Sequence, residues 1–98
     1  MALSSSQTRY LRGLAHALRP VVQLGGRGVT PALLQELGIA LDHHELVKVR
    51  LAGSGRDQRR QQLEALLAGS GAELVQHVGH VASLYRRNPE ATRLALPR

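Results

Sequence analysis

The segment of this sequence that most clearly indicates chemistry is the glycine-rich stretch at residues 25–28, Gly-Gly-Arg-Gly, which follows an apolar run. Glycine lets a backbone approach a ligand closely, and arginine binds phosphate oxygens through two N–H groups at once. Thr30 and Pro31 come next and are typical of a helix start, where unpaired backbone N–H groups attract anions. We therefore expect this loop to contact phosphate. The alternative interpretation is a tight turn that only needs unusual backbone angles.

Basic side chains outnumber acidic ones, with 13 Lys and Arg against 7 Asp and Glu and a formal net charge of +6. Twelve of the 13 are Arg, whose weakly hydrated guanidinium favours polyanionic partners such as nucleic acid. Arg56, Arg59 and Arg60 gather at the start of a predicted helix, where the helix dipole disfavours cations. An external anion would relieve that cost, although a solvated helix face is the alternative explanation.

The aromatic residues limit how a nucleic acid could be bound, because Tyr10 and Tyr85 are the only two in the chain. Proteins that stack several unpaired bases need more aromatic rings than this. We therefore expect any RNA binding to depend on backbone phosphates and on RNA shape.

Other side chains offer little for catalysis or metal binding. The absence of cysteine excludes a disulfide framework, a Cys-based zinc site and a thiol nucleophile. No cysteine or acidic cluster completes a metal site at the histidine pairs at residues 43–44 and 77–80. Asp42 and Glu45 lie near the first pair, but nothing in the sequence defines a pocket there. Ser54 and Ser70 each lie in Gly-Ser-Gly, which lacks the spacing of a nucleophile elbow and is explained more simply by helix capping. The loop at 25–28 is also not followed by the Gly-Lys-Ser/Thr of a nucleotide P-loop. We expect no metal, no cofactor and no enzymatic activity.

The elements before the loop follow from the pattern of apolar residues. Ser4 and Gln7 have the spacing of a capping box, and an apolar stripe over residues 11–18 predicts a helix that Pro20 ends. A short strand is then expected at residues 21–24.

A second helix begins after the loop and is expected to fade near residues 43–44. The segment ELVKVRLAG at residues 45–53 alternates apolar and polar side chains. It predicts a strand with one buried face and one basic face, the latter carrying Lys48 and Arg50.

Ser54, with Asp57 three residues later, predicts the start of a third helix, which a glycine at 69 or 71 ends. Residues 73–78 and 81–86 then have the pattern of two strands around a glycine, which favours a hairpin.

The element order is α-β-α-β-α-β-β, which predicts a single compact α/β domain over residues 1–98. Strand–helix–strand units favour parallel pairing with right-handed crossovers, and the last two strands should be antiparallel. We expect a mixed four-stranded sheet with packed helices. The tail from about residue 88 has no clear pattern and is expected to form a short extended edge. No signal peptide or membrane helix is visible, which favours a cytoplasmic protein.

Several segments occur in a familiar order: "LRGLAHALRPVVQLGGRGVT", "HHELVKVRL", "VGHVASLYRR" and the closing "LALPR". In this order they resemble the bacterial CRM domain, the chloroplast RNA splicing and ribosome maturation domain of the YhbY family. The most specific part is residues 11–30, and the resemblance covers nearly the whole chain. It implies a compact fold similar to the C-terminal domain of translation initiation factor three.

The resemblance also implies RNA binding. Stand-alone bacterial members of this family associate with precursors of the large ribosomal subunit, and plant relatives assist intron splicing. In the family a GxxG loop contributes to RNA binding, as a similar loop does in KH domains. Gly25 and Gly28 match the two glycines, and Arg27 is a plausible phosphate contact.

The expected RNA-binding surface is this loop with a rim of basic residues around it. In parallel strand–helix–strand units, the N-termini of the crossover helices lie at the same end of the sheet, which would bring these residues together. The predicted residues are Gly25, Gly26, Arg27, Gly28, Lys48, Arg50, Arg56, Arg59, Arg60 and Arg86. The sequence thus indicates a non-catalytic protein, monomeric when free, that contacts ribosomal RNA during assembly of the large ribosomal subunit.

Three alternatives stay open at this point. A protein-interaction adaptor could use the arginines on acidic partners and would keep its partner after nuclease treatment. A small enzyme acting on RNA is disfavoured by the missing acid/base cluster. A DNA-binding protein is disfavoured because no recognition helix is evident.

Overall fold

The computed structural model describes residues 2–53, 55–90 and 94–97. Its elements are α1 (Ser5–Ala15), β1 (Val22–Gln23), α2 (Pro31–His44), β2 (Leu46–Arg50), α3 (Arg56–Ser70), β3 (Glu73–Val78) and β4 (Val81–Tyr85). The strands form a sheet in the order β1-β2-β4-β3, in which β1 and β2 are parallel and the other pairs are antiparallel. The predicted α/β class, element order and mixed four-stranded sheet are confirmed.

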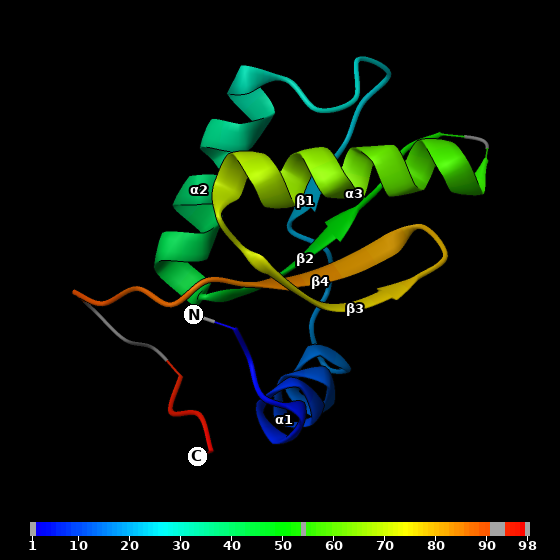
Figure 1. The fold of residues 1–98 in the computed structure, drawn as a ribbon. Coiled ribbons are helices and arrows are strands. Elements are labelled where there is room, and N and C mark those ends of the chain that lie inside the picture. The colour runs from blue at the N-terminus through cyan, green and yellow to red at the C-terminus, as the bar shows by residue number, and fades with distance from the viewer. Residues whose placement is uncertain (1, 54, 91–93, 98) are drawn as a thin grey trace.

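Helices cover both faces of this sheet. Figure 1 shows α2 and α3 on one side and α1 on the other. The larger core lies under α2 and α3, where Val47 and Val49 of β2 meet Leu37 and Leu41 of α2, all at most 1% exposed.

The smaller core lies under α1 and changes the interpretation of β2. Leu46 is 4% exposed and packs with Leu11 and Ala15 of α1. Lys48 and Arg50 lie on the face opposite the two core valines, as predicted, but α1 covers the start of that face at Leu46. The face becomes polar only at Lys48 and Arg50, nearer the end of the strand.

The capping box of α1 is confirmed, since Oγ of Ser4 accepts the N–H of Gln7 and Oε1 of Gln7 accepts the N–H of Ser4. The helix ends at Ala15, earlier than Pro20 requires. The next backbone bonds span three residues instead of four, so the chain tightens and turns away. As a result Leu18, expected on the buried stripe, is 39% exposed.

The regular part of β1 is only two residues long, but its pairing extends further. The N–H groups of Val21 and Leu24 donate to the carbonyl oxygens of Lys48 and Arg50, at 3.1 and 2.9 Å. The hydrogen-bonded contact with β2 therefore covers the predicted strand at residues 21–24.

α3 begins at Arg56, with Gly55 in the capping position. This is one residue later than the predicted cap, Ser54, which itself lies outside the described residues. Gly71 ends the helix in a left-handed conformation, as predicted. Gly69 has a different reason to be glycine, because a Cβ there would lie 2.7 Å from the Leu34 side chain of α2.

The tail does not form the expected edge strand within residues 86–90 and 94–97. Instead Leu94 and Leu96 pack against the core under α1. Their position depends on Glu45, a fully buried residue between α2 and β2. Among the described residues, no helix has the length and apolar character needed to cross a membrane.

Candidate nucleic-acid interface

The glycine-rich loop is a tight turn between β1 and α2. The N–H of Gly28 donates to the carbonyl oxygen of Gly25 at 3.0 Å, which leaves Gly26 and the exposed Arg27 at the tip. Only Gly28 among these residues has a positive φ, of 69°. A Cβ added to Gly25 or Gly26 would meet nothing within 4 Å. The turn therefore requires glycine at position 28 alone, and the other two glycines leave open space beside the backbone.

A polar cavity of about 380 Å³ lies beside this turn. We call it the loop pocket, and its lining residues are Gly25, Gly26, Arg27, Gly28, Ala52, Gly53, Gln58 and Gln62. It exists because β1 and β2 are parallel, so the segments that leave them, the loop and residues 52–53, emerge at the same end of the sheet. The expected meeting of the loop with the start of α3 is thus present in the structure.

The helix whose side chains line the loop pocket is α3, whereas the sequence pointed to the start of α2. The N-terminus of α2 is already largely satisfied, because Oγ1 of Thr30 accepts the N–H of Leu33 and Pro31 has no N–H. The N–H of Leu34 donates to the carbonyl oxygen of Thr30. α3, in contrast, begins after Gly55, which has no side chain to cap it, and its first turns line the pocket. Gln58 belongs to the first turn of α3, so the positive end of the α3 dipole lies at the end of the helix that carries this pocket residue.

The arginines of α3 do not line the loop pocket themselves. With 3.6 residues per turn, Arg60 lies roughly 160° around the helix axis from Gln62, and Arg56 roughly 120° from it. Arg59 is closer to the inner face of the helix and is only partly exposed. These three residues lie at the correct end of the domain, but two of them point away from the loop.

The two basic residues of β2 project from the other face of the sheet. Val47 and Val49 belong to the core under α2 and α3, so strand alternation turns Lys48 and Arg50 toward the α1 side. Lys48 is partly buried and lines an apolar groove beside Leu14 and Leu18. Arg50 is exposed at the end of β2 that leads into the loop pocket.

Arg86 does not belong to this surface. Its guanidinium donates to the carbonyl oxygens of Ser70 and Gly38, at 2.6 and 3.1 Å, and pairs with Asp42 at 3.0 Å. Ser70 is the last residue of α3, so Arg86 contacts that helix about 12 Å along its axis from Gln62 and about 18 Å from Gln58, the two α3 residues of the loop pocket. Its inclusion in the basic rim was wrong, because the guanidinium joins the end of α3 to α2.

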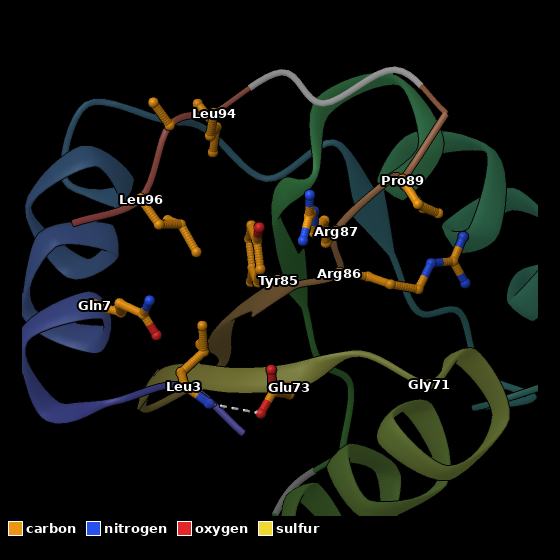
Figure 2. Close-up of a pocket in the computed structure, with 11 residues that line it drawn as sticks. Leu3, Gln7, Gly71, Glu73, Tyr85, Arg86, Arg87, Pro89, Leu94 and Leu96 are labelled. Carbon is orange, nitrogen blue, oxygen red and sulfur yellow. Dashed lines mark hydrogen bonds between the residues drawn. The ribbon is translucent and has the colours of Figure 1, made fainter. Parts of the chain in front are cut away.

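A second cavity, of about 710 Å³, lies near Arg86, between α1, the start of β3, the end of β4 and residues 94–96 (Figure 2). We call it the tail cavity, and it is lined by Leu3, Gln7, Gly71, Glu73, Tyr85, Arg86, Arg87, Pro89, Leu94, Ala95 and Leu96. Burial raises the pKa of the Tyr85 phenol, and the negative charge of Glu45 adds to this effect. The N–H of Leu3 donates to the Glu73 carboxylate at 3.0 Å, so the N-terminal segment is also attached here (Figure 2).

Sequence reasoning missed Gln58 and Gln62, the two α3 side chains that line the loop pocket. Their spacing of four residues places both on one helical face. Nothing in the sequence relates that face to a loop some 30 residues earlier, so only the packing of α3 identifies them. The residues described also contain no group of three or more His, Cys, Asp or Glu side chains that could hold a metal ion.

The sequence of this chain matches that of known proteins over most of its length. It is 46% identical over 96 residues to an RNA-binding protein of Haemophilus influenzae, covering 98% of this chain and 96% of that protein. It is 43% identical over 90 residues to a probable RNA-binding protein of Pseudomonas aeruginosa, covering 92% and 86% of the two chains. A probable RNA-binding protein of Bacillus subtilis is 35% identical over 95 residues, covering 97% and 99%.

The fold also matches a solved structure. The solution structure of a Staphylococcus aureus protein proposed to bind RNA superposes with a TM-score of 0.83 at 32% sequence identity, covering 98% of this chain and 100% of that one. A family model described as the CRS1/YhbY (CRM) domain matches residues 3–86. The predicted resemblance is thereby confirmed, and the chain belongs to the CRS1/YhbY (CRM) domain family.

Proposed function

We propose that this protein binds the phosphate backbone of ribosomal RNA through the loop at residues 25–28, and that it acts without catalysis in assembly of the large ribosomal subunit. The names of its relatives support RNA binding. The observation that carries the site is the open backbone at Gly25 and Gly26 beside the exposed Arg27.

The mechanism follows from the geometry of the loop pocket. An RNA phosphate approaches the turn closely because neither Gly25 nor Gly26 presents a side chain. Arg27 supplies a positive charge at the tip, and the start of α3 adds the positive end of its dipole. These groups recognise no particular base, so selectivity comes from RNA shape and from the surrounding assembly. The protein acts in the cytoplasm, where its proposed RNA partner is assembled.

Crosslinking in cells tests this function. The protein would be crosslinked to RNA by ultraviolet light, purified, and the attached fragments sequenced. Enrichment of fragments from the large-subunit ribosomal RNA, lost in a Gly26→Glu variant, is the expected result. Fragments distributed over messenger RNAs in proportion to their abundance would overturn the assembly role.

The adaptor alternative is separated by nuclease treatment of a native purification. Large-subunit proteins that co-purify through RNA are expected to be lost after digestion. Retention of an acidic protein partner under the same conditions would instead identify the arginines as a protein-binding surface.

A further inference from the structure

The side-chain amide of Gln62, in the loop pocket, has its direction set by a hydrogen bond within the fold. Its Oε1 accepts the N–H of Ala52 at 3.1 Å, across the junction between β2 and α3. An amide that accepts through its oxygen must present its NH₂ group on the other side. The side chain of Gln62 is therefore an oriented donor.

That donor faces the glycine-rich loop. A Cβ placed on Gly28 would lie 4.0 Å from Nε2 of Gln62, and Gln62 lines the loop pocket with the loop residues. In the described part of the chain, Nε2 makes no hydrogen bond to any protein group. The amide nitrogen of Gln62 thus lies beside the loop and has no acceptor among the described residues.

Gln58, one turn earlier, is arranged differently. Its amide lies against Gly53, where an added Cβ would be 2.8 Å from Cδ and Oε1. It lies beside Gly53, whereas Gln62 lies beside residue 28. Of the two glutamines, Gln62 is the one aimed at a ligand on the loop.

We propose that Gln62 donates a hydrogen bond to a non-bridging oxygen of the RNA phosphate held against residues 25–28. This inference rests on the proposed function and adds a contact that carries no charge. Since a neutral donor displaces no counterion, it strengthens binding without changing the salt dependence. Arg27 and Gln62 would then hold the same phosphate group by different physical means.

A Gln62→Glu variant tests the proposal most directly. The carboxylate still accepts the N–H of Ala52, so the local fold is retained, but an acceptor with negative charge replaces the donor. Affinity for a fluorescently labelled RNA hairpin of mixed sequence should fall roughly 10- to 100-fold, as for loss of a hydrogen bond to a charged group. The matched control is Gln61→Glu, which makes the same charge change on the next, exposed residue and does not line the pocket.

A second variant separates the lost donor from the added charge. Gln62→Met keeps the length of the side chain and its neutrality, and should weaken binding while leaving the slope of log affinity against log salt unchanged. Two hairpins that differ only in loop sequence should lose affinity equally. A loss seen with one hairpin alone would overturn the phosphate contact, because Gln62 would then recognise a base.

The failure of this inference is distinguishable from failure of the proposed function. If Gly26→Glu and Arg27→Ala weaken RNA binding but Gln62→Glu behaves like Gln61→Glu, the loop binds RNA and Gln62 takes no part. If Gly26→Glu, Arg27→Ala and Gln62→Glu all leave binding unchanged, the loop itself is not the RNA site. Circular dichroism and thermal melting of each variant confirm that it is folded before its affinity is compared.

Discussion

The loop pocket and the tail cavity both contain arginine and polar side chains, yet they differ in how those groups are satisfied. At the tail cavity, Arg86 uses its guanidinium on two backbone carbonyls and Asp42. Glu45, which does not line the cavity, holds the tail beside it by accepting backbone N–H groups with both carboxylate oxygens. At the loop pocket, Arg27 is exposed at the tip of a turn and Nε2 of Gln62 has no acceptor among the described residues.

The difference teaches how to separate structural from functional polar groups in a basic protein. A positive charge alone does not identify an RNA contact, because Arg86 is as cationic as Arg27. Their hydrogen bonds do separate them, since a side chain whose donors already bind acceptors of the protein has few donors left for a ligand. We therefore expect changes at the tail cavity to lower stability and changes at the loop pocket to lower RNA affinity.

The largest effect is expected for Glu45→Leu. Glu45 is fully buried, and its carboxylate accepts the N–H groups of Asn88 and Leu94 at 2.7 and 2.8 Å. Leucine leaves both donors without this acceptor, so the free energy of unfolding should fall by about 3 kcal/mol or more. Urea denaturation measures this loss, with Glu64→Leu on the exposed face of α3 as the control. A variant as stable as Glu64→Leu would contradict the structural role of Glu45.

Arg86→Ala is expected to have the next largest effect. It removes two hydrogen bonds to carbonyls and a partly exposed ion pair, which together should lower the free energy of unfolding by about 2 kcal/mol. RNA affinity measured where the variant is folded should not change. Arg9→Ala, at an exposed position of α1 outside the tail cavity, is the control for stability. A loss of RNA affinity without a loss of stability would return Arg86 to the basic rim.

Gly26→Glu addresses the loop pocket and should leave stability nearly unchanged. Residue 26 has no positive φ and its Cβ would meet nothing within 4 Å, so the fold accepts a side chain. A carboxylate beside the expected phosphate should weaken RNA binding by at least about tenfold through like-charge repulsion. Gly13→Glu makes the same change on α1, also with open space, and should bind RNA nearly as the wild type does. Equal affinities of the two variants would remove the loop from the interface.

Arg27→Ala should have the smallest effect on affinity but a characteristic salt dependence. Losing one phosphate contact should reduce the slope of log affinity against log salt by about 0.7 to 1, similarly for different RNA sequences. Titrations at several salt concentrations provide the slope, with Arg12→Ala on the exposed side of α1 as the control. An Arg27→Ala slope equal to that of the control would place this guanidinium outside the interface.

The elements of this fold could be predicted from the sequence because their signals are local. The spacing of Ser4 and Gln7 indicates a capping box, Thr30 and Pro31 indicate a helix start, and the alternation at residues 45–53 indicates a strand. Each of these interactions joins residues a few positions apart, so the order of residues alone contains it. The motifs at residues 11–30 indicated the family for a similar reason, since they are read at fixed spacing along the chain.

The errors have a common cause in contacts between residues far apart along the chain. The basic face of β2 is partly covered by α1, and Arg86 contacts Gly38 across 48 positions. Local periodicity cannot show which helix crosses which strand. It equally could not show that Glu45, between a helix and a strand, would hold the tail through Leu94, 49 positions later.

The sequence by itself thus determined the class of the fold, the position of the glycine-rich loop and the excess of arginine that favours a polyanionic partner. The tertiary structure decided which polar and charged groups remain available to bind RNA. It placed the loop against α3 instead of leaving it only at the start of α2, and it oriented Gln62 through Ala52. The physical reason is that charge and helix propensity belong to single residues and short segments. A donor without an acceptor is defined only when the packed chain has assigned all its other hydrogen bonds.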